Sequence, residues 1–104
     1  MTTRKEPQIR RKELLKIAVD LASYQDYSKL YAKDIALTAD CSRGLVVHYL
    51  GTTEEIHAEV MRIGIKRKVL RIVAYGLIHN HPLALAAPKG LREESFQYVA
   101  TGQL

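Results

Sequence analysis

The segment AKDIALTADCSRGLVVHYLG, residues 32–51, decides the fold that we expect for this chain. Its first half places apolar residues on one face of a short helix over residues 32–39, although no strong capping residue precedes that helix. Ser42 is a preferred N-cap for a second helix over residues 43–50, and Gly51 suits the end of that helix. Two short helices joined by so tight a turn predict a helix-turn-helix unit.

An amphipathic helix is predicted upstream of this unit, over about residues 9–22. Its apolar side chains recur at intervals of three and four residues, as one buried helix face requires. We find no alternating run of β-branched residues that would predict a strand. We therefore expect an all-α fold, a small helical bundle that contains a helix-turn-helix. The predicted buried face of the first helix consists of Leu14, Ile17, Ala18, Leu21 and Ala22.

Downstream of the unit, Thr52 and Glu55 form the capping-box pattern T-x-x-E and predict the start of a fourth helix. The apolar stripe of that helix extends to about Asn80. We expect a bend or break near Gly64, because glycine is a poor helix former. A last, weaker helix is predicted over residues 91–100.

The chain has 104 residues, of which 47% are apolar, and this fits a single globular domain. We expect a flexible basic tail over residues 1–8, a helix-turn-helix head over residues 9–51, and a helical dimerisation segment and tail over residues 52–104. Cys41 is the only cysteine, which excludes a disulfide framework and a CxxC zinc motif. No uncharged apolar run approaches the ~20 residues of a membrane-spanning helix, and no signal-peptide pattern opens the chain.

Sixteen Lys and Arg residues outnumber eleven Asp and Glu residues, and the resulting net charge of +5 favours an anionic partner. One basic cluster lies in residues 1–16. Near a helix-turn-helix, such a cluster is expected to touch phosphates or the minor groove. A second basic cluster, residues 62–71, is interleaved with apolar residues, and we prefer to interpret it as a solvated face opposite an interface.

Residues 39–50, Ala-Asp-Cys-Ser-Arg-Gly-Leu-Val-Val-His-Tyr-Leu, resemble the recognition segment of the TetR family of bacterial repressors. That family typically reads Ala-Gly-Val-Ser-x-Gly-Thr-x-Tyr-x-Tyr/His-Phe there. Asp34-Ile35-Ala36 is similar to the family's first motif helix, and Gly51–Ile56 to the start of its fourth helix. With the similar turn at Asp26-Tyr27, the resemblance covers about residues 9–61 and implies a helical DNA-binding head.

The chain departs from the TetR pattern at positions that serve DNA contact. Leu30 and Tyr31 stand where the family has two threonines, and Leu45 and Val47 replace a threonine and a tyrosine of the recognition helix. Thr53 replaces the lysine that opens helix four. The family's second half, a helical ligand-binding and dimerising domain, has no counterpart in this sequence. The resemblance therefore implies DNA binding and says little about an inducer.

In this motif the N-terminal side chains of the second helix meet base edges in the major groove, and the first helix crosses the backbone. Arg43 is expected to contact a base or a phosphate, and Gly44 to let the backbone approach DNA. Leu45, Val46 and Val47 are expected to touch apolar groups such as thymine methyls. Solvated surface or core packing is the plain alternative at these positions. The residues expected to contact DNA are Arg10, Lys29, Tyr31, Lys33, Ser42, Arg43, Gly44, Leu45, Val46, Val47, His48 and Tyr49.

A homodimer is expected, because one recognition helix reads only a few base pairs. The apolar stripe of the fourth helix is longer than the head can cover, so we predict the dimer contact there. A small-molecule effector is not expected, because a pocket of roughly 300 Å³ would compete with the core for the side chains after Glu55. The predicted interface consists of Ile63, Leu70, Val73 and Leu77.

We expect no enzyme activity, no cofactor and no metal site. No nucleophile, general base or pair of carboxylates has a recognisable spacing. His79 and His81 are two residues apart, and this spacing does not place them on one helix face.

These patterns predict a sequence-specific transcriptional regulator of double-stranded DNA, a repressor that blocks its operator as a homodimer in the bacterial cytoplasm, at the nucleoid. Its short length resembles regulators of phages and plasmids. The main alternative is a helical protein-interaction adaptor whose helix-turn-helix has decayed. A third possibility is a helix over residues 62–73 that lies on a membrane surface.

Overall fold

The computed structural model describes residues 6–104, which form seven α-helices and one short 3-10 turn, with no strand among them. The prediction of an all-α bundle is therefore confirmed. Arg4 and Lys5 of the predicted tail lie outside the described residues, whereas Pro7 and Gln8 belong to the first helix and not to a tail. The elements are α1 (Pro7–Ala22), the turn η1 (Tyr27–Lys29), α2 (Ala32–Ala39), α3 (Arg43–Leu50), α4 (Thr53–Arg67), α5 (Leu70–Ile78), α6 (Pro82–Leu85) and α7 (Lys89–Ala100).

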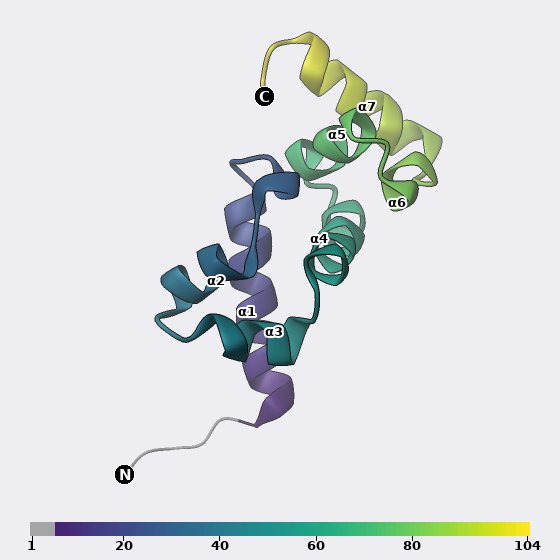
Figure 1. The fold of residues 1–104 in the computed structure, drawn as a ribbon. Coiled ribbons are helices and arrows are strands. Elements are labelled where there is room, and N and C mark those ends of the chain that lie inside the picture. Colours follow the sequence, from purple (N-terminus) through teal and green to yellow (C-terminus); the bar gives the residue numbers. More distant parts are fainter. Residues whose placement is uncertain (1–5) are drawn as a thin grey trace.

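Helix α1 is the centre of the head, where it packs against α2, α3 and α4 (Figure 1). Pro7 starts the helix at a position where the missing N–H of proline costs no bond. Leu15 and Val19 are buried in addition to the predicted face, because α4 covers a second side of α1. Full burial of a leucine contributes about 1.5–3 kcal/mol, so α1 supplies a large share of the core energy.

Helices α2 and α3 have the bounds that the sequence predicts. They bury Ile35, Val46 and Leu50 in a core that they share with α1. Leu30, between η1 and α2, is fully buried in the same core. The helix-turn-helix is therefore held from behind by apolar packing, and its outer face is left to solvent.

Helices α4 and α5 are two helices, although the sequence predicts one helix that breaks near Gly64. The predicted capping box is present, since the Thr52 N–H donates to Glu55 Oε1 at 3.1 Å and Thr52 Oγ1 accepts from the Glu55 N–H at 3.2 Å. The break comes four residues after Gly64, at Lys68, whose φ of 57° is left-handed. Gly64 instead lets α5 approach, because a Cβ there would lie 2.6 Å from Cγ2 of Ile72.

The C-terminal helices cover the stripe that the sequence assigns to a dimer interface. Helix α7 packs on α5, and Val73, Ala87 and Leu91 form a second apolar cluster there (Figure 1). Val73 is 0% exposed, so its predicted place in a dimer interface is wrong. The other predicted interface residues, Ile63, Leu70 and Leu77, are half-buried against the two apolar clusters.

The final helix starts at Lys89, two residues before the predicted start, and the short helix α6 precedes it. Within residues 6–104, no helix combines the length and the hydrophobicity that crossing a membrane requires.

Candidate nucleic-acid interface

The turn between α2 and α3 is closed by local hydrogen bonds that fix the direction of α3. Asp40 takes the left-handed conformation, with φ of 54°, which aspartate tolerates better than most residues. The Cys41 N–H then donates to the Ala36 carbonyl at 3.0 Å, as in a Schellman closure. Ser42 Oγ accepts the Leu45 N–H at 3.1 Å, which confirms Ser42 as the N-cap.

The start of α2 is fixed by a carboxylate within the helix. Asp34 accepts the Tyr31 backbone N–H at 2.8 Å, so the third helical residue closes the end that the Tyr31 side chain does not cap. In the sequence, this way of closing the helix start is indicated by Asp34, an acidic residue at the third position of α2. The bond fixes the backbone at Tyr31 and leaves its side chain at the surface.

The predicted DNA-contact residues of α3 lie on two faces of the helix, one exposed and one buried. Arg43, Val47 and His48 are exposed, together with Gly44. Val46 is 0% exposed and packs in the core, so its predicted contact with DNA is wrong. The physical reason is helical periodicity, because Val46 lies four residues before the buried Leu50 and shares its face.

The remaining predicted residues of α3 are at the boundary between core and surface. Leu45 and Tyr49 are half-buried, and the Tyr49 ring packs against the His48 ring with a centroid distance of 4.9 Å. At Gly44, a Cβ would meet only Ser42 Oγ, at 4.0 Å, so packing within the described chain does not require glycine there. This open position suits close approach by a partner molecule.

An open groove of about 420 Å³ lies where α3 meets the start of α2. The structure brings four predicted contact residues together in its wall: Tyr31 and Lys33 from α2, and Arg43 and Val47 from α3. Ala32 and Thr53 complete the lining. We call these six residues the reading groove. Two cations therefore face the same space as one tyrosine and one valine.

Two predicted contact residues, Lys29 and Arg10, lie neither in the reading groove nor on α3 or its N-cap. Lys29 is exposed on η1, and Arg10 is half-buried near the start of α1. The Arg10 guanidinium forms an ion pair with Glu13 at 3.5 Å. Neither position shares a wall with Arg43, so any contact they make with DNA would be to a separate part of the backbone.

The sequence analysis missed two exposed residues of α2, Leu37 and Thr38. Leu37 is 85% exposed, although the sequence gives it an apolar side chain. Helical spacing carried the signal, since Leu37 lies four residues after the exposed Lys33 and on the opposite side from the buried Ile35 and Ala36. A single exposed leucine is common on protein surfaces and does not by itself mark a binding site.

The net charge around η1, α2 and the start of α3 is small. Lys29, Lys33 and Arg43 are its cations, and Asp34 and Asp40 are its carboxylates. The larger share of the positive charge is on α1 and at the end of α4. The local electrostatic field of this region is therefore weak, and its cations are a few separately placed side chains.

A cluster of aromatic rings joins the head to the C-terminal helices, and one of its members, His57, lies beside Tyr31 of the reading groove at a centroid distance of 6.4 Å. Tyr27 is buried, and the rings of His57, His79 and His81 each lie edge-on to it, at centroid distances of 5.4, 5.9 and 5.8 Å. Asp26 Oδ2 lies 2.7 Å from His79 Nε2. The cluster therefore links η1 to α4 and to the residues on either side of the α5–α6 connection.

Two groups of this cluster have shifted pKa values. Partial burial of Asp26 raises its pKa, but the hydrogen bonds from His79 and Ser28 outweigh that effect and leave the pKa below its ordinary value. Burial lowers the pKa of His81, and the neighbouring His57 lowers it further. His81 Nδ1 also accepts the Leu83 N–H at 3.2 Å, which caps α6 and uses the unprotonated nitrogen.

Comparison with known proteins gives no relative. No family model, no curated protein and no solved structure matches the chain. Within residues 6–104, no group of three or more His, Cys, Asp or Glu side chains is placed to hold a metal ion.

Proposed function

We propose that this protein is a sequence-specific DNA-binding transcriptional regulator that represses by occupying its operator. The observation that carries the proposal is the reading groove, in which Lys33 and Arg43 stand beside the Ser42-capped N-terminus of α3. A helix N-terminus with exposed donors is suited to phosphate, and the side chains that follow it are suited to base edges. The TetR-like order of motifs remains part of the proposal.

The proposed binding mode inserts the start of α3 into the major groove. Arg43 donates two hydrogen bonds to a guanine, and Val47, one turn later, contacts a thymine methyl. Lys33 and the Tyr31 hydroxyl bind phosphates from the start of α2. The exposed Gly44 permits the helix backbone to lie close to the DNA. Occupation of the operator then excludes the polymerase.

The proposal includes a homodimer. Its contact surface is on α7, in place of the α4–α5 stripe that the sequence predicts. Phe96 is 59% exposed and Val99, three residues later, is 37% exposed, so the two lie on one outer face of α7. Pairing this face with its two-fold copy would bury it and present two α3 helices to one operator.

The test is binding to labelled duplex DNA, followed by fluorescence anisotropy at several salt concentrations. We expect duplex binding that weakens as salt rises, with Lys33→Ala binding all duplexes more weakly and with a slope of log affinity against log salt smaller by about 0.9. Lys66→Ala, at an exposed position of α4 outside the reading groove, is the matched control and should leave the slope unchanged. Equal effects of the two substitutions would refute the proposed site.

A second function, that of a protein-interaction adaptor, is favoured by one observation. Leu37, Tyr31 and Val47 are 85%, 44% and 46% exposed, and such apolar side chains suit a partner helix as well as DNA. This second reading requires that duplex DNA fails to bind in the same anisotropy measurement. DNA binding that depends on Lys33 and Arg43 excludes it.

A further inference from the structure

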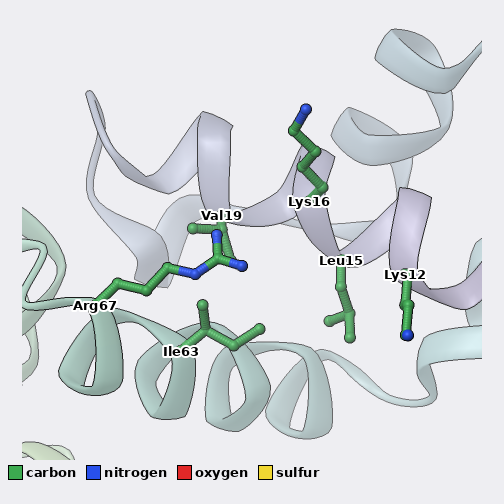
Figure 2. A pocket seen from close by; sticks show the side chains of 6 residues that line it. All are labelled: Lys12, Leu15, Lys16, Val19, Ile63 and Arg67. Atoms are coloured by element: carbon green, nitrogen blue, oxygen red, sulfur yellow. The ribbon is translucent and has the colours of Figure 1, made fainter.

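A second groove, of about 460 Å³, lies between α1 and α4 (Figure 2). It is lined by Lys12, Leu15, Lys16 and Val19 of α1 and by Ile63 and Arg67 of α4. None of these six residues lines the reading groove. The two grooves are therefore separate features of the head, and the second one has no role in the proposed DNA contact.

The floor of this groove is apolar and its rim is cationic. Leu15 and Ile63 form the floor, while Arg67 extends across α4 so that its guanidinium lies beside Val19 (Figure 2). Ile63 and Arg67 are one helical turn apart, which aligns floor and rim on one face of α4. An open space with apolar walls and a few charged groups is the usual composition of a small-ligand site.

The cations of the rim have no internal partner. Lys12, Lys16 and Arg67 are exposed and form no ion pair with another described residue; Arg67 extends into the space between the helices, whereas Lys16 points away from α4 (Figure 2). Arg11, next to Lys12, differs because it pairs with Glu59 at 3.7 Å. No carboxylate lines the groove, so an anion that enters it meets attraction only.

We propose that the α1–α4 groove binds a small amphiphilic anion, a monomeric carboxylate with a medium-length alkyl chain. The carboxylate pairs with Arg67, whose planar guanidinium fits two carboxylate oxygens. The alkyl chain lies along Leu15 and Ile63 toward Lys12 (Figure 2). Lys12 and Lys16 add long-range attraction for the negative charge.

This proposal differs from the sequence-based expectation that no small-molecule effector binds. That expectation counted only side chains after Glu55, whose apolar surface the core does use. In the α1–α4 groove, α1 supplies four of the six lining residues. The α1–α4 groove therefore uses none of the side chains that α5 and α7 place in the core.

The experiment is a titration of the ¹⁵N-labelled full chain with sodium octanoate, followed by NMR chemical shifts. We expect saturable shifts in α1 and α4 and none in α3. Arg67→Gln should weaken octanoate binding about tenfold, since a charge-assisted bidentate pair is lost. Lys66→Gln, the adjacent exposed cation outside the groove, is the matched control and should change the affinity less than twofold.

Two further ligands show whether the charge of octanoate is recognised and whether a lipid surface competes for the site. Octanol, which has the chain without the charge, should bind at least about tenfold more weakly than octanoate. Vesicles containing phosphatidylglycerol should not compete for the site. The proposal is overturned if octanoate gives no saturable shifts, if octanol binds equally well, if both substitutions weaken binding equally, or if only the vesicles bind. None of these outcomes bears on the DNA contact, which uses other residues.

Discussion

At the scale of single residues, Arg43 is the side chain on which the proposed base reading depends. It is exposed, it lies directly after the Ser42 cap, and it faces the groove that Lys33 also lines. We expect Arg43→Ala to weaken binding to a selected duplex by about 1–3 kcal/mol, with a much smaller effect on random duplex. Anisotropy titrations with both duplexes measure the difference. An equal loss on both would make Arg43 a phosphate contact.

His81 is expected to make the fold sensitive to mild acid. Its pKa is lowered in the folded protein from the ordinary value of about 6.5, so the unfolded chain binds the proton more readily. The stability it contributes is fully present above about pH 6.5 and is lost as the pH falls toward the lowered value. His81→Asn keeps an N-cap side chain for α6 and cannot titrate.

We therefore expect the free energy of unfolding of the wild-type protein to fall more steeply between pH 7.5 and 5 than that of His81→Asn. Urea denaturation at a series of pH values measures both slopes. His57 and His79 remain in both proteins, so the difference between the slopes reports His81 together with its coupling to His57. Parallel curves would show that the cap does not depend on the protonation of His81.

At the scale of helices, the sequence predicts those ends that local chemistry determines. Ser42 caps α3, Gly51 follows it with φ of 90°, and Thr52 with Glu55 starts α4, all as predicted. The end of α4 could not be predicted in this way. It comes at Lys68, because α5 turns back to pack on α4, and that packing joins residues that no local pattern relates.

Substitution of Gly76 tests whether close helix packing requires glycine at this position of α5. A Cβ there would lie 2.6 Å from Met61 Cε and 2.7 Å from Ala84 Cβ. We expect Gly76→Ala to destabilise the protein by about 1–3 kcal/mol, because overpacking outweighs the gain in helix propensity. Gly90→Ala is the control, since a Cβ at Gly90 meets nothing within 4 Å. Urea denaturation that finds the two variants equally stable would contradict this account.

The candidate site was predictable in part, for reasons that lie in helix geometry. The exposed positions Arg43 and His48 follow from the cap and the helix phase. Val46 was assigned wrongly because the resemblance to a recognition segment names a stretch and not a face. Leu37 was missed because its apolar side chain suggests a core position, although its spacing from Lys33 places it on the exposed face of α2.

At the scale of the whole molecule, the C-terminal helices change where a dimer can form. The sequence shows an apolar stripe but not what covers it, and α7 covers it within the same chain. We expect sedimentation equilibrium to give a mass near twice 11.8 kDa at micromolar concentration. Phe96→Glu should give 11.8 kDa with its helix content retained, because Phe96 is exposed.

Val73→Glu provides the contrast for the dimer. Val73 is fully buried between α5 and α7, so an unpaired carboxylate there should unfold the C-terminal helices and not merely separate two subunits. Circular dichroism distinguishes these effects. A wild-type mass of 11.8 kDa across the concentration range would refute the dimer, and a folded monomeric Val73→Glu protein would restore the original stripe as the interface.

The most direct test of the proposed function is selection of bound DNA from a pool of random double-stranded sequences by the wild-type protein. The account predicts enrichment of one motif with two-fold symmetry. Its half-sites should lie about 10 base pairs apart, centre to centre, or at a multiple of that spacing, as two copies of α3 on one face of the duplex require. Recovery of duplexes with no enriched motif, or of no duplex at all, would contradict it.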